Sequence, residues 1–258
     1  MLKKRIIPKF LIRGGRLVKG VRFLQNFREA GNPVSTAKVY DSYGVDELMF
    51  VDIDATMENR LASGSIIKRV SEEVFMPFTV GGGIRSLDDI AILLQSGADK
   101  VSITTEAALN PNFIRAAAMS FGNQCIVAGL DYSLDCDGRP RLFTHGGTRA
   151  TELDPIEYGQ RMQDQHAGEI SLCSIDRDGT MSGFDIELIH TLSGKLDIPL
   201  IASGGAGTLD HCKEALNAGA SAITISSMFL FTDHSPIKVR TYLATNGVKV
   251  RSQKGSHS

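Results

Sequence analysis

The feature that most constrains the fold of this chain is a repeat that relates its two halves. Three segments of the first half recur in the second half, at offsets of 175 − 51 = 124, 204 − 82 = 122 and 218 − 96 = 122 residues. The matched pairs are VDIDATM (51–57) with IDRDGTM (175–181), GGIRSLD (82–88) with GGAGTLD (204–210), and SGADKVSITT (96–105) with AGASAITISS (218–227). No low-complexity linker separates the halves, so we expect one domain with the same loop chemistry on opposite sides.

Short β-rich runs alternate with segments of helical periodicity along the whole chain. The predicted strands are RIIPKFL, ELMFVDI, PFTVGG, KVSITT, QCIVAGLD, EISLCSID, PLIASGG and AITISS. Helical patterns such as SLDDIAILLQSGA and HCKEALNAGA lie between most of them. This order predicts an α/β fold, a single (βα)8 TIM barrel built from two half-barrel repeats over residues 1–250, with a polar tail at 251–258. An open doubly wound sheet is the alternative, because it could share the pattern.

Composition narrows the expected partners and compartment. The net charge of −1 gives no electrostatic case for nucleic acid, and no apolar run approaches the roughly 20 residues of a membrane span. The four cysteines are scattered without a CxxC pair, which indicates free thiols, a cytoplasmic location and no zinc site. We expect neither a cofactor nor a membrane partner.

Glycine-rich turns follow the third and seventh predicted strands, in TVGGGI and ASGGAG. Hydroxyl pairs follow the fourth and eighth strands, at Thr104 and Thr105 and at Ser226 and Ser227. Glycine lets backbone N–H groups approach an anion closely, and hydroxyl groups can complete a phosphate cradle. Because this constellation occurs twice, the sequence predicts a ligand with two phosphates, one at each side of the barrel mouth. The alternative is that the glycines only make tight βα turns.

Carboxylates cluster at the predicted strand ends, at Asp52, Asp54, Asp131, Asp176 and Asp178. Five acids at one face are costly unless they bind donors, a metal or a substrate, and sugar hydroxyls with one general acid–base would suit them. A divalent metal is the rival interpretation, which the lack of a histidine at ligand spacing weakens. We count Asp52 among the candidate substrate-binding residues, although it could equally be a buried acid that bonds loop amides. Asp131 ends an apolar strand and is the stronger candidate for catalysis.

The repeat exposes an asymmetry at the first strand of each half. RIIPKFL (5–11) aligns with CIVAGLD (125–131) at an offset of 125 − 5 = 120, which sets Leu11 against Asp131. One half therefore ends this strand in a carboxylate, and the other half ends it in a leucine. Leu11 is either an ordinary core residue or the lost half of a catalytic pair.

Charged residues also stand at the opposite ends of the strands. They are Arg5, Glu47, Lys100 and Glu169, each at a predicted strand start, and we call them the charged ring. In a closed barrel these two acids and two bases would converge at the bottom. The residues alone favour a neutralised plug that stabilises the barrel.

Seven motifs together resemble the cyclase subunit family of imidazole glycerol phosphate synthase, from histidine biosynthesis. They are KRIIP, GRLVKG, VDELMFVDI, PFTVGGGI, GADKVSI, SIDRDGT and IASGGAG, and the similarity covers nearly the full length. The resemblance implies a lyase-type synthase subunit that forms a heterodimer with a glutaminase subunit docked at the bottom of the barrel. Ammonia from the glutaminase would cross the barrel and attack a bisphosphorylated ribulosyl intermediate at the top. The products would be imidazole glycerol phosphate and an aminoimidazole carboxamide ribotide.

The resemblance also implies roles for individual residues. It makes the charged ring the ammonia entrance, against the plug interpretation, and it places Asp99 at the glutaminase interface. Asp131 becomes one of two catalytic aspartates, and Lys19 becomes a loop residue over the substrate. The residues that hold or flank the two phosphates are Gly83, Thr105, Asp178, Gly179, Gly204, Gly205, Ser226 and Ser227.

Departures from the family pattern bear directly on activity. The second catalytic aspartate of the family falls on Leu11, and leucine cannot transfer a proton. A substrate-contacting asparagine falls on Thr104, a threonine on Cys173 and a serine on Gly146, and Asp54 stands where a threonine is common. The charged ring and phosphate loops are intact. This combination resembles cyclase-like paralogues from surface-polysaccharide gene sets, which pair with a glutaminase-like partner and supply ammonia to an amidotransferase acting on an N-acetylated sugar.

The sequence leaves four hypotheses open. The first is such a paralogue, which conducts ammonia for sugar amidation with a sugar amidotransferase as a third component. The second is a working cyclase in which Asp131 acts with a substitute acid such as Asp54. The third is the related half-barrel isomerase, which needs no ammonia and which the charged ring and the KRIIP start disfavour. The fourth is a scaffold that only activates a glutaminase.

Overall fold

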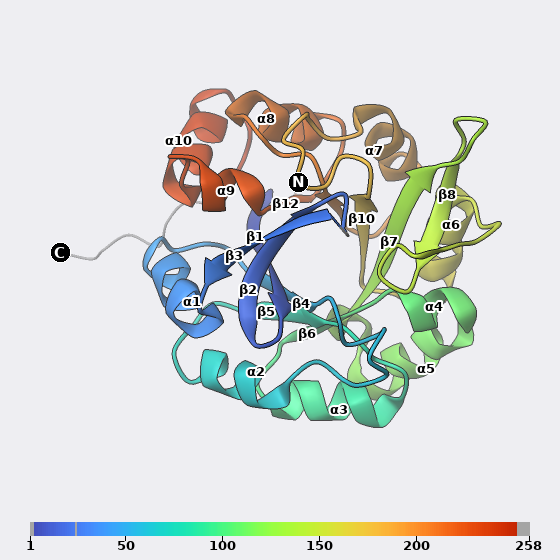
Figure 1. The fold of residues 1–258 in the computed structure, drawn as a ribbon. Helices are drawn as coiled ribbons and strands as arrows, with labels where there is room; N and C mark the ends of the chain where they lie inside the picture. The colour runs from blue at the N-terminus through green and yellow to red at the C-terminus, as the bar shows by residue number, and fades with distance from the viewer. Residues whose placement is uncertain (1–2, 24, 252–258) are drawn as a thin grey trace.

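The computed structural model describes residues 3–23 and 25–251, and a closed parallel barrel forms their centre (Figure 1). Its eight strands are β1 (Arg5–Arg13), β4 (Leu48–Asp52), β5 (Phe78–Gly81), β6 (Lys100–Ile103), β7 (Ile126–Leu134), β10 (Glu169–Ser174), β11 (Leu200–Ser203) and β12 (Ala222–Ile225). They pair in the order β10-β11-β12-β1-β4-β5-β6-β7, and β7 pairs back with β10. The predicted TIM barrel is confirmed, and the closed order excludes the open doubly wound sheet. The predicted polar tail lies, apart from Arg251, outside the described residues.

Helices surround the strands as an outer ring (Figure 1). They are α1 (Pro33–Ser42), α2 (Gly64–Ser71), α3 (Leu87–Gln95), α4 (Thr105–Leu109), α5 (Asn112–Phe121), the 3-10 helix η1 (Asn123–Cys125), α6 (Pro155–Asp164), α7 (Ile186–Ser193), α8 (Leu209–Asn217), α9 (Ser227–Phe231) and α10 (Pro236–Thr245). The two segments with the clearest helical periodicity form α3 and α8. Each begins at an N-cap hydroxyl, Ser86 for α3 and Thr208 for α8, at matching positions of the repeat.

Alternation of side chains along the barrel strands creates two separate cores. On β1, Ile6, Phe10 and Ile12 point outward into the large core between the strands and the helices. A smaller apolar layer lies inside the barrel and consists of Ile7, Met49, Val127, Ile201 and Ala222. This layer separates the bottom of the barrel interior from the mouth.

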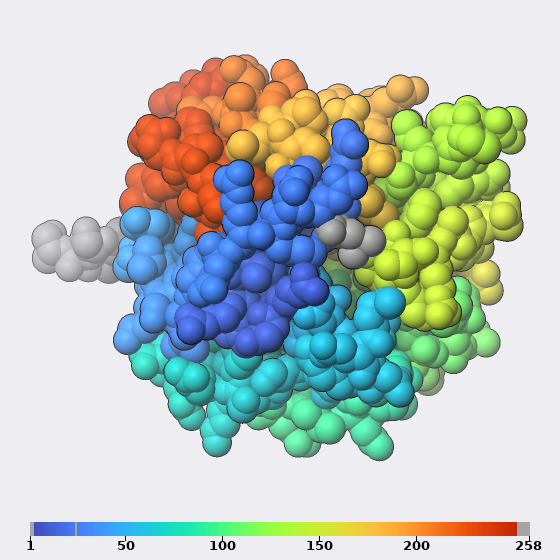
Figure 2. Space-filling model, in the orientation of Figure 1, coloured from blue at the N-terminus to red at the C-terminus, as the bar shows by residue number. Residues whose placement is uncertain are grey.

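Two antiparallel hairpins extend the barrel at its mouth. They consist of β2 (Arg16–Val21) with β3 (Gln25–Gly31), and of β8 (Pro140–Thr144) with β9 (Arg149–Ala150). β1 continues to Arg13, two residues beyond the end of the predicted strand RIIPKFL at Leu11. The chain reverses through Gly14 and Gly15, whose φ angles of 54° and 77° suit a two-residue hairpin turn. In the space-filling view the N-terminal segment lies across the centre of this face (Figure 2).

Candidate functional site

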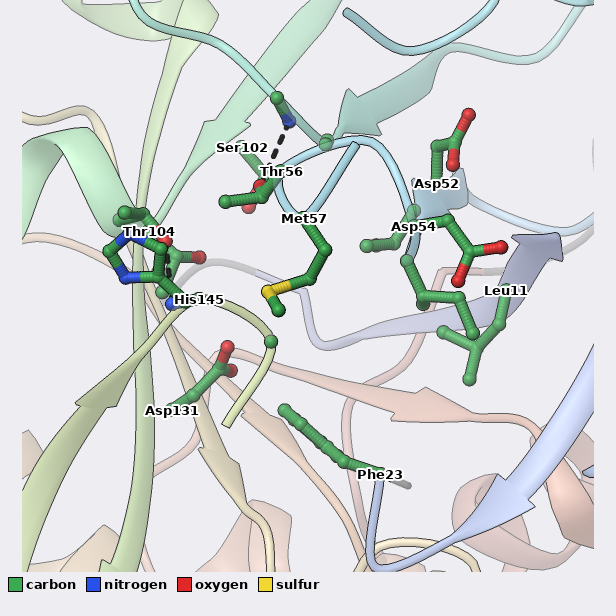
Figure 3. A pocket seen from close by; sticks show the side chains of 18 of the residues that line it. Leu11, Phe23, Asp52, Asp54, Thr56, Met57, Ser102, Thr104, Asp131 and His145 are labelled. Carbon is green, nitrogen blue, oxygen red and sulfur yellow. Dashed lines mark hydrogen bonds between the residues drawn. The ribbon is translucent and has the colours of Figure 1, made fainter. Parts of the chain in front are cut away.

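A pocket opens at the carboxyl ends of the barrel strands, where the βα loops meet. β1 and β7 lie four strands apart in either direction around the barrel, so residues near their ends face each other. Figure 3 shows Leu11 of β1 and Asp131 of β7 on opposite sides of the pocket, with Met57 and Phe23 projecting toward the space between them. The asymmetry between the two half-barrels therefore places the apolar side chain of Leu11 opposite the carboxyl of Asp131.

Asp131 is the acid best suited to proton transfer. Burial raises the pKa of its carboxyl to about 6, while the nearby ammonium of Lys9 acts to lower it and the carboxylate of Asp178 acts to raise it. Within the described residues no side chain or backbone N–H donates a hydrogen bond to Asp131. A free carboxyl with a pKa close to neutrality can both take up and release a proton during a reaction.

The other acids at the strand ends have donors of their own. Arg60 donates two hydrogen bonds to Asp52, of 2.6 and 3.0 Å, and Arg13 pairs with Asp54 at 3.2 Å. Asp176 accepts from a hydroxyl and a backbone N–H of β7. Asp52 lines the pocket, but Arg60 occupies both of its oxygens, which fits the alternative of a buried acid that organises its own loop.

Lys9 lies at the floor of the pocket and belongs to none of the predicted sites. Its side chain is buried, and its Nζ donates to Ser203 Oγ at 3.2 Å and to Cys173 Sγ at 3.8 Å. Burial acts to lower the pKa of Lys9, but Cys173, Asp178 and Asp131 act against it and the net shift is upward. A signal was available, because alternate residues of β1 face the barrel interior and this lysine occupies such a position.

The first predicted phosphate loop lies at the rim of the pocket, beyond β5 and β6. The N–H of Gly83 donates to Thr56 Oγ1 at 3.3 Å, and the N–H of His145 donates to Thr105 Oγ1 at 3.0 Å. Gly83 has a φ of 71°, and a Cβ there would lie 1.8 Å from the carbonyl oxygen of Arg60, so no other residue fits. The Thr105 hydroxyl accepts from His145 and keeps its own proton available for an anion.

The second predicted phosphate loop lies beside a buried ion pair, in which Lys19 Nζ contacts Asp178 Oδ2 at 2.5 Å. The structure brings the whole predicted set to one small pocket, lined by Lys19, Asp178, Gly179, Gly204, Gly205, Ser226 and Ser227. The Oγ of Ser226 is buried and has no hydrogen-bond partner among the described residues. A buried hydroxyl without a partner is unusual in a folded protein, and a bound anion would supply the missing acceptor.

The charged ring closes the opposite end of the barrel. Arg5 contacts Glu47 at 2.8 Å and Glu169 at 3.1 Å, and Lys100 contacts the same two acids at 3.0 and 3.2 Å. Thr79, on the strand between β4 and β6, donates to Glu47 Oε1 at 2.7 Å. Within the described residues Glu169 Oε2 is buried without a hydrogen-bond partner. The four predicted residues therefore meet in one ring of alternating charge.

The pocket at the mouth of the barrel also brings together three of the positions that depart from the pattern of the resembled cyclase family. Thr104 and Gly146 line the pocket, and Cys173 lies beneath its floor against Lys9. His145 also lines the pocket, and its backbone N–H donates to Thr105 Oγ1, although no sequence motif indicated a role for this histidine. Burial lowers the pKa of His145, and Arg149 lowers it further, so the imidazole is neutral at pH 7 and can accept or donate a hydrogen bond.

Asp99 stands apart from both clusters. It is exposed at the start of β6, and its carboxylate accepts from the backbone N–H of Phe78 at 2.9 Å. Residues 3–23 and 25–251 contain no group of three or more His, Cys, Asp or Glu side chains placed to hold a metal ion. Of the helices in this part of the chain, none combines the length and apolar character needed to cross a membrane.

Comparison with known protein families agrees with this arrangement. A family model described as histidine biosynthesis protein matches residues 5–235, which is 235 − 5 + 1 = 231 of the 258 residues. The matched region runs from β1 past β12 and so contains the charged ring, Asp131 and both predicted phosphate loops. The chain is a (βα)8 barrel that belongs to the histidine biosynthesis protein family.

Proposed function

We propose that this barrel is an ammonia-receiving synthase subunit of the imidazole glycerol phosphate synthase type, which works with a glutaminase subunit. The observation that carries the proposal is the charged ring beneath an apolar interior layer. The free Oε2 of Glu169 is an acceptor for ammonia or ammonium that enters at this end. A ring that served stability alone would be expected to pair its buried oxygens.

Leu11 is the reason for proposing ammonia transfer without ring closure. Its side chain is buried and faces the pocket, where leucine has no proton to exchange. Asp131 therefore has no carboxylate across the pocket at the matching position of the repeat. We propose that the ammonia acceptor is a surface sugar bound by a sugar amidotransferase, and this step draws on the resemblance to polysaccharide-linked paralogues.

A working cyclase is the second candidate, and the position of Asp54 favours it. Figure 3 shows Asp54 beside Leu11 in the pocket wall. Its partner Arg13 has a side chain that is 48% exposed, so the ion pair can open without uncovering a buried charge. If Asp54 replaces the missing acid, Asp54→Asn should abolish imidazole glycerol phosphate formation. Full cyclase activity in that variant would exclude this role.

Glutamate release tests the proposed partnership. The purified barrel is titrated into a glutaminase subunit with glutamine, and we expect a complex and a severalfold rise in glutamate release. Asp99→Lys, at the bottom of the barrel, should weaken the complex, whereas Asp137→Lys, exposed in the β7–β8 hairpin at the other end, should not. The proposal is wrong if the two proteins neither associate nor change the glutaminase rate at micromolar concentrations.

A further inference from the structure

Lys9 and Asp131 are the two charged groups of the pocket floor that remain without an ionised partner among the described residues. Within residues 3–23 and 25–251, the Nζ of Lys9 forms hydrogen bonds only with Ser203 and Cys173, and no carboxylate lies within 4.0 Å of it as an ion-pair partner. The acid that could have paired with it, Asp178, is held by Lys19. An ammonium and a carboxylate thus face the same pocket without contacting each other.

The partners of Lys9 do not neutralise it. Burial raises the pKa of the Cys173 thiol to about 11, so at pH 7 the sulfur is a neutral thiol. Ser203 accepts from Lys9 and also from Thr224 Oγ1, at 2.8 Å, and carries no charge. The hydrogen-bond partners of this buried ammonium are therefore both neutral, and the charges of Asp178 and Asp131 are what favour its charged form. Buried charges held in this way are costly for the folded protein and are commonly kept for binding or catalysis.

The position of Lys9 relates it to both phosphate loops. It lines the main pocket together with Asp131 and Thr105, and it also lines the smaller pocket beside Ser226 and Gly205. A ligand with its phosphate in either loop would therefore extend over the Lys9 ammonium. An ammonium has three donors and no acceptor, whereas an ionised carboxylate only accepts. Together they match a ligand that presents an oxygen acceptor next to a hydroxyl donor.

The opposite wall of the pocket restricts the ligand further. Besides Asp52 and Asp54, which pair with Arg60 and Arg13, it presents the apolar side chains of Leu11, Phe23, Met49, Val51 and Met57. These side chains offer no hydrogen bonds, so a ligand covered with polar groups on every side would lose hydrogen bonds to water on this side. The complementary ligand has one face of C–H groups and one edge of oxygen atoms.

We propose that Lys9 and Asp131 are a ligand-binding pair that selects a phosphorylated ketose or a related sugar phosphate. Lys9 donates to the carbonyl oxygen of the ligand, and Asp131 accepts from the adjacent hydroxyl. The proposal rests on the phosphate-binding mouth of the proposed function, but it needs neither the glutaminase nor ammonia. The Lys9–Asp131 pair would select the ligand by its carbon chain, which the predicted phosphate loops do not contact.

Calorimetric binding of D-ribulose 5-phosphate and of inorganic phosphate tests this pair. The unmodified protein should bind the ketose phosphate more tightly than phosphate. Lys9→Met should weaken ketose phosphate binding by about 10- to 100-fold, the range for a hydrogen bond from a charged donor. It should weaken phosphate binding by a smaller factor, because Lys9 also lines the second predicted phosphate pocket, and an equal loss for both compounds would overturn the proposal. Lys195→Met, which removes an exposed lysine outside both pockets, is the control and should change neither.

The outcomes separate the two proposals. If phosphate binds but the ketose phosphate binds no more tightly, or if Lys9→Met leaves both affinities unchanged, the role of Lys9 is wrong and the phosphate-binding mouth stands. If neither compound binds, the mouth itself is wrong and the Lys9 proposal falls with it. If Lys9→Met does not fold, NMR of the unmodified protein with 13C-labelled lysine replaces it, and the Lys9 13Cε resonance is assigned as the one missing from Lys9→Arg. The chemical shift of this resonance must change more with ketose phosphate than with phosphate. An equal change with both compounds overturns the proposal.

Discussion

Asp131→Asn should stabilise this protein at neutral and alkaline pH, because the barrel disfavours the charged form of the Asp131 carboxyl. Burial raises its pKa from 3.8 to about 6. The folded protein therefore binds this proton more tightly than the unfolded chain does. The contribution of the carboxyl to stability is most favourable at low pH and is lost as the pH rises from about 4 to about 6. Asparagine has nearly the same shape and carries no charge that must be desolvated.

The size of the effect follows from the shift. A change from 3.8 to about 6, at about 1.4 kcal/mol per pKa unit, corresponds to about 3 kcal/mol at pH 8. Because the pocket is open to water on one side, we expect a gain of about 1.5–3 kcal/mol. The same linkage leaves about half of that gain at pH 5 and less than about a quarter at pH 4.

Urea unfolding of both proteins at pH 5 and pH 8 measures this difference. Asp135→Asn is a control of opposite sign, because the backbone N–H of Arg139 and the side chain of Arg141 lower the pKa of Asp135. That variant should lose stability at pH 8. If Asp131→Asn is no more stable than the unmodified protein at pH 8, or if its gain does not grow from pH 5 to pH 8, the electrostatic account of Asp131 is refuted.

Three further changes test other parts of the site. Lys100→Met leaves two acids and one base in the charged ring and should lower the unfolding free energy by about 1–3 kcal/mol; equal stability in urea would contradict the ring geometry. Gly205→Ala brings a Cβ to 2.0 Å from a carbonyl oxygen and should cost more than about 2 kcal/mol, whereas Gly138→Ala, whose Cβ meets nothing within 4 Å, should cost about 1 kcal/mol. Lys19→Met leaves Asp178 unpaired and should weaken inorganic phosphate binding about tenfold by calorimetry, and an unchanged affinity would place the anion elsewhere.

The parts of the fold that depend on local pattern were predictable from the sequence. The strands, the helices α3 and α8 and the two glycine-rich loops each carry their signal within about ten residues, and the repeat then orders them into a barrel. The charged ring was predictable for the same reason, since each of its members marks the start of a strand. Once the strands close into a barrel, the four strand starts lie at the same end, so these side chains must meet there.

The residues that were missed depend on contacts between distant segments. Alternation along β1 puts Lys9 on the interior face, but its contacts with Ser203 of β11 and Cys173 of β10 are needed to place it at the floor of a pocket. The β1–β2 hairpin was missed because Gly14 and Gly15, which form its turn, also fit a loop. The sequence could not show that Arg60 donates to both oxygens of Asp52, because Arg60 lies in an irregular segment without a pattern.

The ratio of two products tests the central claim most directly, namely that this barrel passes ammonia on without closing the imidazole ring. The barrel is mixed with its glutaminase subunit, glutamine and the bisphosphorylated ribulosyl intermediate, and glutamate and imidazole glycerol phosphate are measured together. We predict that glutamate accumulates without a matching amount of the imidazole product, because Leu11 faces Asp131 where a second acid is needed. Equal amounts of the two products would contradict this account and establish a working cyclase.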